Sequence, residues 1–251
     1  MRDALRLAVG TLTAFPVPPP RQVDGDVARR AMLLAPVAAL PLAMLAGAVV
    51  LSGDAVELPP LLTATGAMGA MALATRGMHL DGLADTADGL GASYDRERAL
   101  DVMRRGDVGP MGVATVVLVL LAQVAALAGA VAAGHGVFAA VAGVLAGRLV
   151  LGVCCLRKVP AARPEGLGAA VAGSTPLWQV AVVLALGVAL AAAGGVLAGL
   201  PPWRGAVAVL LAVAACGVLL WRCVRRLGGI TGDVLGACVE AATLGALLAL
   251  A

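Results

Sequence analysis

Long apolar segments alternate with short polar connections along this chain. A helix that crosses a bilayer needs about 20 apolar residues, and seven segments approach that length: 31–51, 58–75, 111–133, 136–156, 177–199, 205–223 and 234–251. The first contains Pro36 and Pro41, and the last contains Glu240, which makes it marginal. The pattern predicts an all-α, polytopic membrane bundle of about six to seven transmembrane helices. We expect one membrane domain, 1–251, that begins with an interfacial or cytoplasmic segment, 1–30.

Composition supports this class. The chain of 251 residues is 61% hydrophobic and 13% charged, whereas soluble domains are about 45–50% apolar and about 25% charged. A lipid bilayer is therefore the expected surrounding, and no nucleic-acid partner is expected. The cysteines lack the spacing of a metal site. We expect each to be a small buried apolar residue, and they are Cys154, Cys155, Cys216, Cys223 and Cys238.

Basic residues predict the orientation of the bundle. Of the 18 Lys and Arg residues, all fall in the N-terminal segment or in alternate connections except Arg204, on the other side, and Arg148, inside an apolar segment. The positive-inside rule makes the basic side cytoplasmic. The polar connection 76–110 should then face the cytoplasm from a multi-pass protein of the cell membrane.

An acidic motif opens that connection. Asp81, Asp85 and Asp88 have the spacing i, i+4 and i+7, so in a helix they share one face. Like charges at this spacing repel one another, and hard oxygen ligands suit Mg²⁺, with Mn²⁺ as a substitute. The simpler interpretation is a solvated acidic turn, and the glycines inside the motif weaken the case for one regular helix.

The rest of 76–110 predicts a phosphate site. An amphipathic helix is followed by a glycine-rich turn, and Arg104 and Arg105 precede the next apolar segment. Arginines and free backbone N–H groups beside a metal are suited to bind a diphosphate. His79 lies roughly opposite Asp81 in a straight helix, so it is either a substrate contact or a packed polar residue.

Three further charges lie in apolar surroundings. Arg148 either extends to the interface or contacts a phosphate or carboxylate. Asp233 and Glu240 are seven residues apart and share a helix face. Asp233 alone could be a helix cap, but Glu240 lies two turns deeper and needs a partner, for which Arg148 is one candidate.

These motifs resemble those of the cobalamin synthase family, the adenosylcobinamide-GDP ribazoletransferases. The resemblance covers nearly the whole chain and rests on 79–89, 96–98, 103–104, Gly109, Gly112, 147–148, 159–166 and 227–237. The chain departs from the family at one point. Relatives commonly have an Asp directly after the Met-Arg pair, but this chain has Arg105, and the nearest acid is Asp107.

The resemblance implies a Mg²⁺-dependent phosphotransferase with an acidic active site at the cytoplasmic face. It would join adenosylcobinamide-GDP to α-ribazole or its 5′-phosphate, giving adenosylcobalamin or its phosphate and GMP. The implied catalytic residues are Asp81, Asp85, Asp88 and Asp233. The first three would bind the metal, and one of them, with Asp88 as the candidate, would also be the base. Implied substrate or phosphate contacts are His79, Arg104, Asp107, Arg148, Thr231 and Glu240. A homo-oligomer or a complex with other late cobalamin enzymes is an open alternative.

Two other functions fit the same broad pattern. A CDP-alcohol phosphotransferase of phospholipid synthesis also combines an acidic DG motif with a membrane bundle, but its motif has Ala-Arg where Ala84 is followed by Asp85. A secondary transporter would place its ion site at the bilayer midplane within an inverted repeat. The chain shows no such repeat, and its acids cluster near the ends of the apolar segments.

Overall fold

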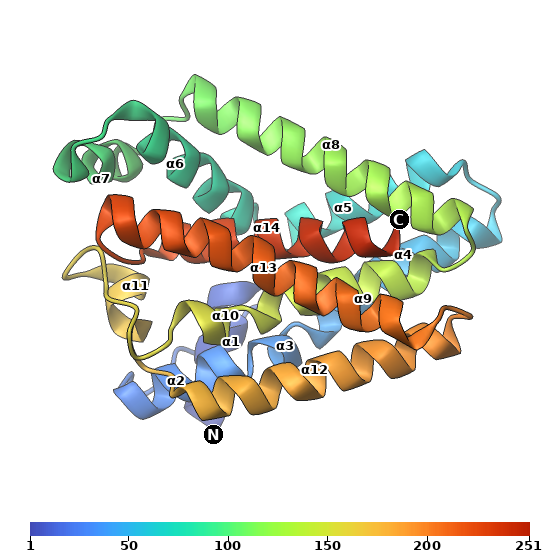
Figure 1. The fold of residues 1–251 in the computed structure, drawn as a ribbon, viewed down its shortest axis with the longest axis horizontal. Helices are drawn as coiled ribbons and strands as arrows, with labels where there is room; N and C mark the ends of the chain where they lie inside the picture. The colour runs from blue at the N-terminus through green and yellow to red at the C-terminus, as the bar shows by residue number, and fades with distance from the viewer.

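The structure is a computed structural model that describes residues 1–251 as a bundle of helices (Figure 1). The helices are α1 Arg2–Leu12, α2 Gly25–Leu33, α3 Ala35–Ala38, α4 Leu40–Ala55, α5 Pro60–Ala74, α6 Met78–Ala92, α7 Arg96–Arg105, α8 Pro110–Ala132, α9 Gly136–Leu149, α10 Leu151–Cys154, α11 Gly166–Val171, α12 Leu177–Leu197, α13 Pro202–Leu227 and α14 Gly232–Leu250.

The polytopic all-α prediction is confirmed. Five helical stretches are long and apolar enough to cross a membrane, namely α8, α9 with α10, α12, α13 and α14. Helices α4 and α5 are apolar but shorter. The predicted first span, 31–51, is divided between α2, α3 and α4. Pro36 and Pro41 stand in the first turns of α3 and α4, because proline lacks an N–H group and is tolerated only where a helix begins.

Helix α14 lies at the centre of the bundle. It packs against α13, α6, α9 and α8, and 72% of its apolar window is buried, against 11% for α12. The segment that looked marginal by sequence is therefore the core helix, and α12 covers the outside (Figure 1). Close crossing requires small residues here. A Cβ at Gly245 would lie 2.7 Å from the carbonyl oxygen of Leu211 on α13.

The polar elements gather at one end of the bundle. Helices α6, α7 and α11 lie there, with the end of α13 and the start of α14 (Figure 1, left). The predicted leading segment 1–30 holds α1 and α2, and α1 buries Ala4, Leu7 and Leu12. The C-terminus lies at the other end, where Arg204 donates a hydrogen bond to the carbonyl oxygen of Ala251 at 2.7 Å.

Candidate active site

The acidic motif forms one continuous helix. Gly77 has φ +67°, which lets the chain turn from α5 into α6, and α6 then runs unbroken through Gly82 and Gly89. These glycines allow close packing. A Cβ at Gly82 would lie 2.7 Å from the carbonyl oxygen of Asp233, and one at Gly89 would collide with the Met103 side chain. The predicted helix is confirmed.

The two acidic motifs meet where α6 crosses α14. Besides the contact of Gly82 with Asp233, a Cβ at Gly236 would lie 3.1 Å from the Cα of His79. The backbones of α6 and α14 therefore approach so closely at two successive turns that glycine is needed at each contact. This crossing places the Asp233 side chain beside the aspartates of α6. We call Asp81, Asp85 and Asp233 the acidic mouth.

Thr231, not Asp233, caps α14. Thr231 is the N-cap residue, and its hydroxyl accepts a hydrogen bond from the N–H of Val234 at 3.2 Å. The same hydroxyl donates to Asp233 Oδ2 at 3.1 Å. The interpretation of Asp233 as a simple helix cap is therefore wrong. The structure also gives Thr231, predicted as a substrate contact, a positioning role toward the Asp233 carboxylate.

Asp88 is bound to backbone amides. Its Oδ2 accepts from the N–H of Gly109 at 2.7 Å, and its Oδ1 accepts from the N–H of Gly112 at 2.8 Å. Asp88 thus caps the start of α8 from a neighbouring helix. The glycine-rich turn was expected to offer free N–H groups to a diphosphate, and this expectation is wrong for these two amides. A Cβ on either glycine would collide with the Asp88 carboxylate.

Asp85 is an acid whose ionised form is disfavoured by its surroundings. It is 7% exposed. Burial first, and then the carboxylates of Asp81, Asp233 and Asp88, raise its pKa to about 6, and Arg163 opposes the rise. Asp81 is exposed at the opening. No three of these carboxylates bring an oxygen each to within 4.8 Å of one another.

Arg163 is the basic residue nearest the acidic mouth. Its Nη1 lies 3.8 Å from Asp233 Oδ2, and its Nη2 donates to the carbonyl oxygen of Leu100 at 2.7 Å. The segment that carries Arg163 is bound to the residues just before α14, because the N–H of Ile230 donates to the Pro160 carbonyl oxygen at 2.9 Å. Arg163 lies within the range 159–166 that carries the resemblance, but the sequence did not predict it as a site residue. The two predicted contacts in this region, Arg104 and Asp107, are exposed.

A second polar group lies deeper between the helices. Arg148 is 3% exposed, and its Nη2 lies 3.3 Å from His79 Nδ1. Burial, and then the Arg148 guanidinium, hold the pKa of His79 well below its usual value, so the neutral ring accepts from Arg148. Glu240 Oε2 accepts from Gln123 Nε2 at 2.9 Å. Gln123 is the partner that the sequence reasoning missed. Its signal was a lone amide within the predicted span 111–133.

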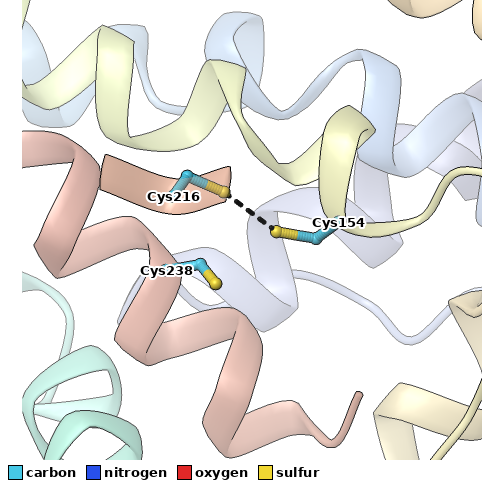
Figure 2. Close-up of side chains that lie close together, drawn as sticks. All are labelled: Cys154, Cys216 and Cys238. Carbon is cyan, nitrogen blue, oxygen red and sulfur yellow. Dashed lines mark hydrogen bonds between the residues drawn. The ribbon is translucent and has the colours of Figure 1, made fainter. Parts of the chain in front are cut away.

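Three cysteines also meet inside the bundle (Figure 2). The Sγ atoms of Cys154, Cys216 and Cys238 lie within 4.8 Å of one another, and the first two are 3.5 Å apart. They come from α10, α13 and α14. All five cysteines are buried and free, which confirms the expected burial. Their meeting could not be predicted because it depends on how three separate helices pack.

These features define an integral membrane protein of helices whose polar site lies at one end. The family model described as Cobalamin-5-phosphate synthase matches residues 4–251. The chain therefore belongs to this family, and it is a transferase of cobalamin synthesis. This assignment confirms the resemblance and leaves the phospholipid-synthesis and transporter alternatives without support.

The curated relatives match over nearly their full length. A Nocardioides protein named adenosylcobinamide-GDP ribazoletransferase is 51% identical over 99% of this chain and 98% of its own. Proteins with the same name from Frankia casuarinae and Klebsiella pneumoniae are 40% and 36% identical, over 98% and 97% of this chain and 93% and 97% of their own. No solved structure matches.

Proposed function

We propose that this chain is an adenosylcobinamide-GDP ribazoletransferase whose chemistry takes place at the acidic mouth. It would transfer the adenosylcobinamide phosphoryl group from adenosylcobinamide-GDP to α-ribazole or its 5′-phosphate and release GMP. The observation that carries the proposal is the α6–α14 crossing, which brings Asp233 beside Asp81 and Asp85 in a chain matched end to end by relatives of that name.

The residues of the mouth suit phosphoryl transfer. A ribose hydroxyl attacks the phosphorus nearest the cobinamide, a new P–O bond forms, and the P–O bond to GMP breaks. Asp85, with its pKa raised to about 6, is placed in range to accept the hydroxyl proton at neutral pH. Both Asp88 oxygens already accept N–H groups, so Asp85 is the better base. Arg163 supplies positive charge beside the developing phosphoryl charge.

The donor set fits Mg²⁺, with Mn²⁺ as a substitute. Asp81 and Asp233, which line the same cavity, would hold it, since carboxylate oxygens are the ligands that hard cations prefer. Asp85, the proposed base, would stay beside the ion without binding it. Mg²⁺ usually keeps several waters and binds through one or two carboxylates plus substrate phosphates, which suits a mouth whose oxygens stand apart. The bound ion would neutralise charge on the phosphoryl oxygens. Asp88, predicted as a ligand, would instead fix α6 against α8.

One assay tests the proposal. Purified protein in detergent is mixed with adenosylcobinamide-GDP and either α-ribazole or its 5′-phosphate, and GMP release is measured with Mg²⁺, with Mn²⁺ and with a chelator. We expect GMP release that a chelator abolishes and either metal restores. No GMP release with either acceptor would refute the reaction. Release that persists in the chelator would refute the metal requirement alone.

The site is proposed to face the cytoplasm of the cell membrane. The support is the positive-inside rule, because basic residues are concentrated in the segments around α6 and α7, which lie at one end of the bundle (Figure 1). Glu97 and Asp54 are exposed at positions that the rule assigns to opposite sides. In whole cells, a membrane-impermeant thiol reagent should label Asp54→Cys but not Glu97→Cys, because the native thiols are buried. The reverse labelling would contradict the orientation.

A further inference from the structure

Asp81 borders two different cavities. The smaller has a volume of about 240 Å³ and lies between α6, α14 and the N-terminal helices α1 and α2. The larger has a volume of about 640 Å³ and lies between α6 and α8. Met78 and Asp81 are the residues that line both. Asp81, one residue of the acidic mouth, is therefore at the junction of the two cavities, and Asp233 lines the smaller one.

The smaller cavity is lined by both polar and apolar side chains. His79, Asp81 and Asp233 line it together with Met32, Leu151 and Leu167. Pockets for drug-sized ligands measure about 300–1,000 Å³, so this space suits a small molecule. A nucleoside with an apolar base matches it in both respects, because the base can lie against the aliphatic side chains while the ribose hydroxyls reach the aspartates.

The larger cavity is open and mostly apolar. Its α8 side consists of valines, of which Val113 and Val117 are 52% and 49% exposed. Arg76 lies at the same cavity, near Asp81. Helix α8 is an apolar helix with only 22% of its window buried, so this cavity opens toward the lipid-facing surface. A bulky amphipathic molecule with an anionic group matches such a space.

We propose that the two cavities separate the two substrates. The smaller cavity binds the nucleoside acceptor, and the larger binds the corrinoid and diphosphate of the donor, with Arg76 near the phosphates. This assignment rests on the proposed function. The acceptor hydroxyl and the phosphorus then meet at Asp81 from two cavities. Such an arrangement suits a displacement in which the attacking and leaving oxygens are roughly in line.

Two cavity-filling variants and one control test the assignment. Leu167→Trp narrows the smaller cavity from the partly buried helix α11, and Val116→Trp narrows the larger one from α8. Leu186→Trp adds the same bulk at an exposed position of α12. The wild type and each variant are assayed for GMP release while one substrate is varied at a saturating level of the other, and thermal unfolding checks each fold.

We expect each Trp variant to raise the KM of only the substrate whose cavity it narrows. Leu167→Trp should raise the KM for the acceptor at least about tenfold and change the KM for adenosylcobinamide-GDP less than about twofold, because lost ground-state binding appears in KM. Val116→Trp should do the reverse, and Leu186→Trp should change neither. Equal changes in both KM values, no change in either, or the opposite pairing would overturn the assignment.

The outcomes also separate the two proposals. If the wild-type protein releases no GMP, the proposed function itself is refuted. If the wild type is active but the two variants do not affect the KM values of different substrates, only the assignment of the cavities is refuted. Should a Trp variant unfold, Leu167→Phe and Val116→Phe fill less space and are judged by the same KM criteria. Binding of radiolabelled α-ribazole to folded Leu167→Trp gives a second readout, and unchanged affinity there would overturn the assignment.

Discussion

Asp233 and Glu240 share one face of α14, but different groups surround their two carboxylates. Asp233 lies at the mouth among other carboxylates, and its closest cation, Arg163, is 3.8 Å away. Glu240 lies two turns deeper and is hydrogen-bonded to Gln123 at 2.9 Å. Buried polar groups normally find partners, so the paired acid needs no ligand to explain it. The crowded acids do, and they mark the functional end of the helix.

The same contrast divides the acidic motif itself. Asp88 resembles Glu240, because both of its oxygens are used by N–H groups of α8. Asp85 differs, because the charged groups that act on it most strongly are the carboxylates of Asp81, Asp233 and Asp88. One helix face with three aspartates thus carries two roles. Within this motif, two backbone N–H donors distinguish the structural carboxylate of Asp88 from the carboxylate of Asp85.

The largest effect should come from Asp85→Asn. The substitution keeps the shape of the side chain and removes both its charge and its ability to accept a proton. We expect the rate of GMP release to fall at least about 10³-fold, which corresponds to about 4 kcal/mol of transition-state stabilisation. The unfolding temperature should not fall, because a repelled charge is removed. Near-normal turnover would contradict the placement of the reaction at the mouth.

Asp233→Ser should also lower activity strongly, by about 10²-fold or more. Serine caps a helix about as well as aspartate, so a capping role would make this change nearly silent. The structure assigns the cap to Thr231, and Thr231→Ser keeps the hydroxyl and is the matched control. GMP release and thermal unfolding are measured for both variants. An active Asp233→Ser protein would show that the second motif lies outside the reaction.

Much of the fold could be predicted from the sequence because membrane spans depend on local composition. Length, apolarity and the basic connections indicated the bundle, and the spacing of Asp81, Asp85 and Asp88 indicated one helix. The resemblance also assigned the motifs 79–89 and 227–237 to one active site, and each motif contains glycines at the α6–α14 crossing. Close backbone crossing is the physical reason for those glycines.

What the sequence could not indicate depends on contacts between distant helices. Arg148 was one candidate partner for Glu240, and its charge does act on Glu240, but the hydrogen bond comes from Gln123, which the packing of α8 on α14 supplies. Asp88 looked equivalent to its neighbours until the start of α8 was placed beside it. The role of α1 was missed for the same reason, since Thr11 and Leu12 line the smaller cavity only through tertiary packing.

A smaller effect is expected at Glu240, and it concerns stability rather than turnover. Gln123→Leu should lower the free energy of unfolding by about 1–3 kcal/mol, because it leaves Glu240 buried without its hydrogen bond. Turnover per folded molecule should stay close to that of the wild type. The double variant Gln123→Leu with Glu240→Leu should recover part of the loss, since neither polar group is then stranded. A loss of turnover without destabilisation would contradict this structural role and would show that Gln123 and Glu240 take part in the reaction.

The smallest effect concerns pH. Asp85 has a folded-state pKa of about 6, above its usual 3.8, so the folded protein binds this proton more tightly than the unfolded chain does. Its contribution to stability is therefore present below pH about 4 and is lost as pH rises through about 6. In a chelator, the unfolding temperature of the wild type should fall more between pH 5 and pH 7 than that of Asp85→Asn, which lacks the titrating group. Added Mg²⁺ should oppose the fall at pH 7, because a bound cation favours the ionised carboxylate. Identical pH profiles for the two proteins would show that the charges at the mouth are already neutralised within the chain, and the contrast between Asp85 and Glu240 would then lose its physical basis.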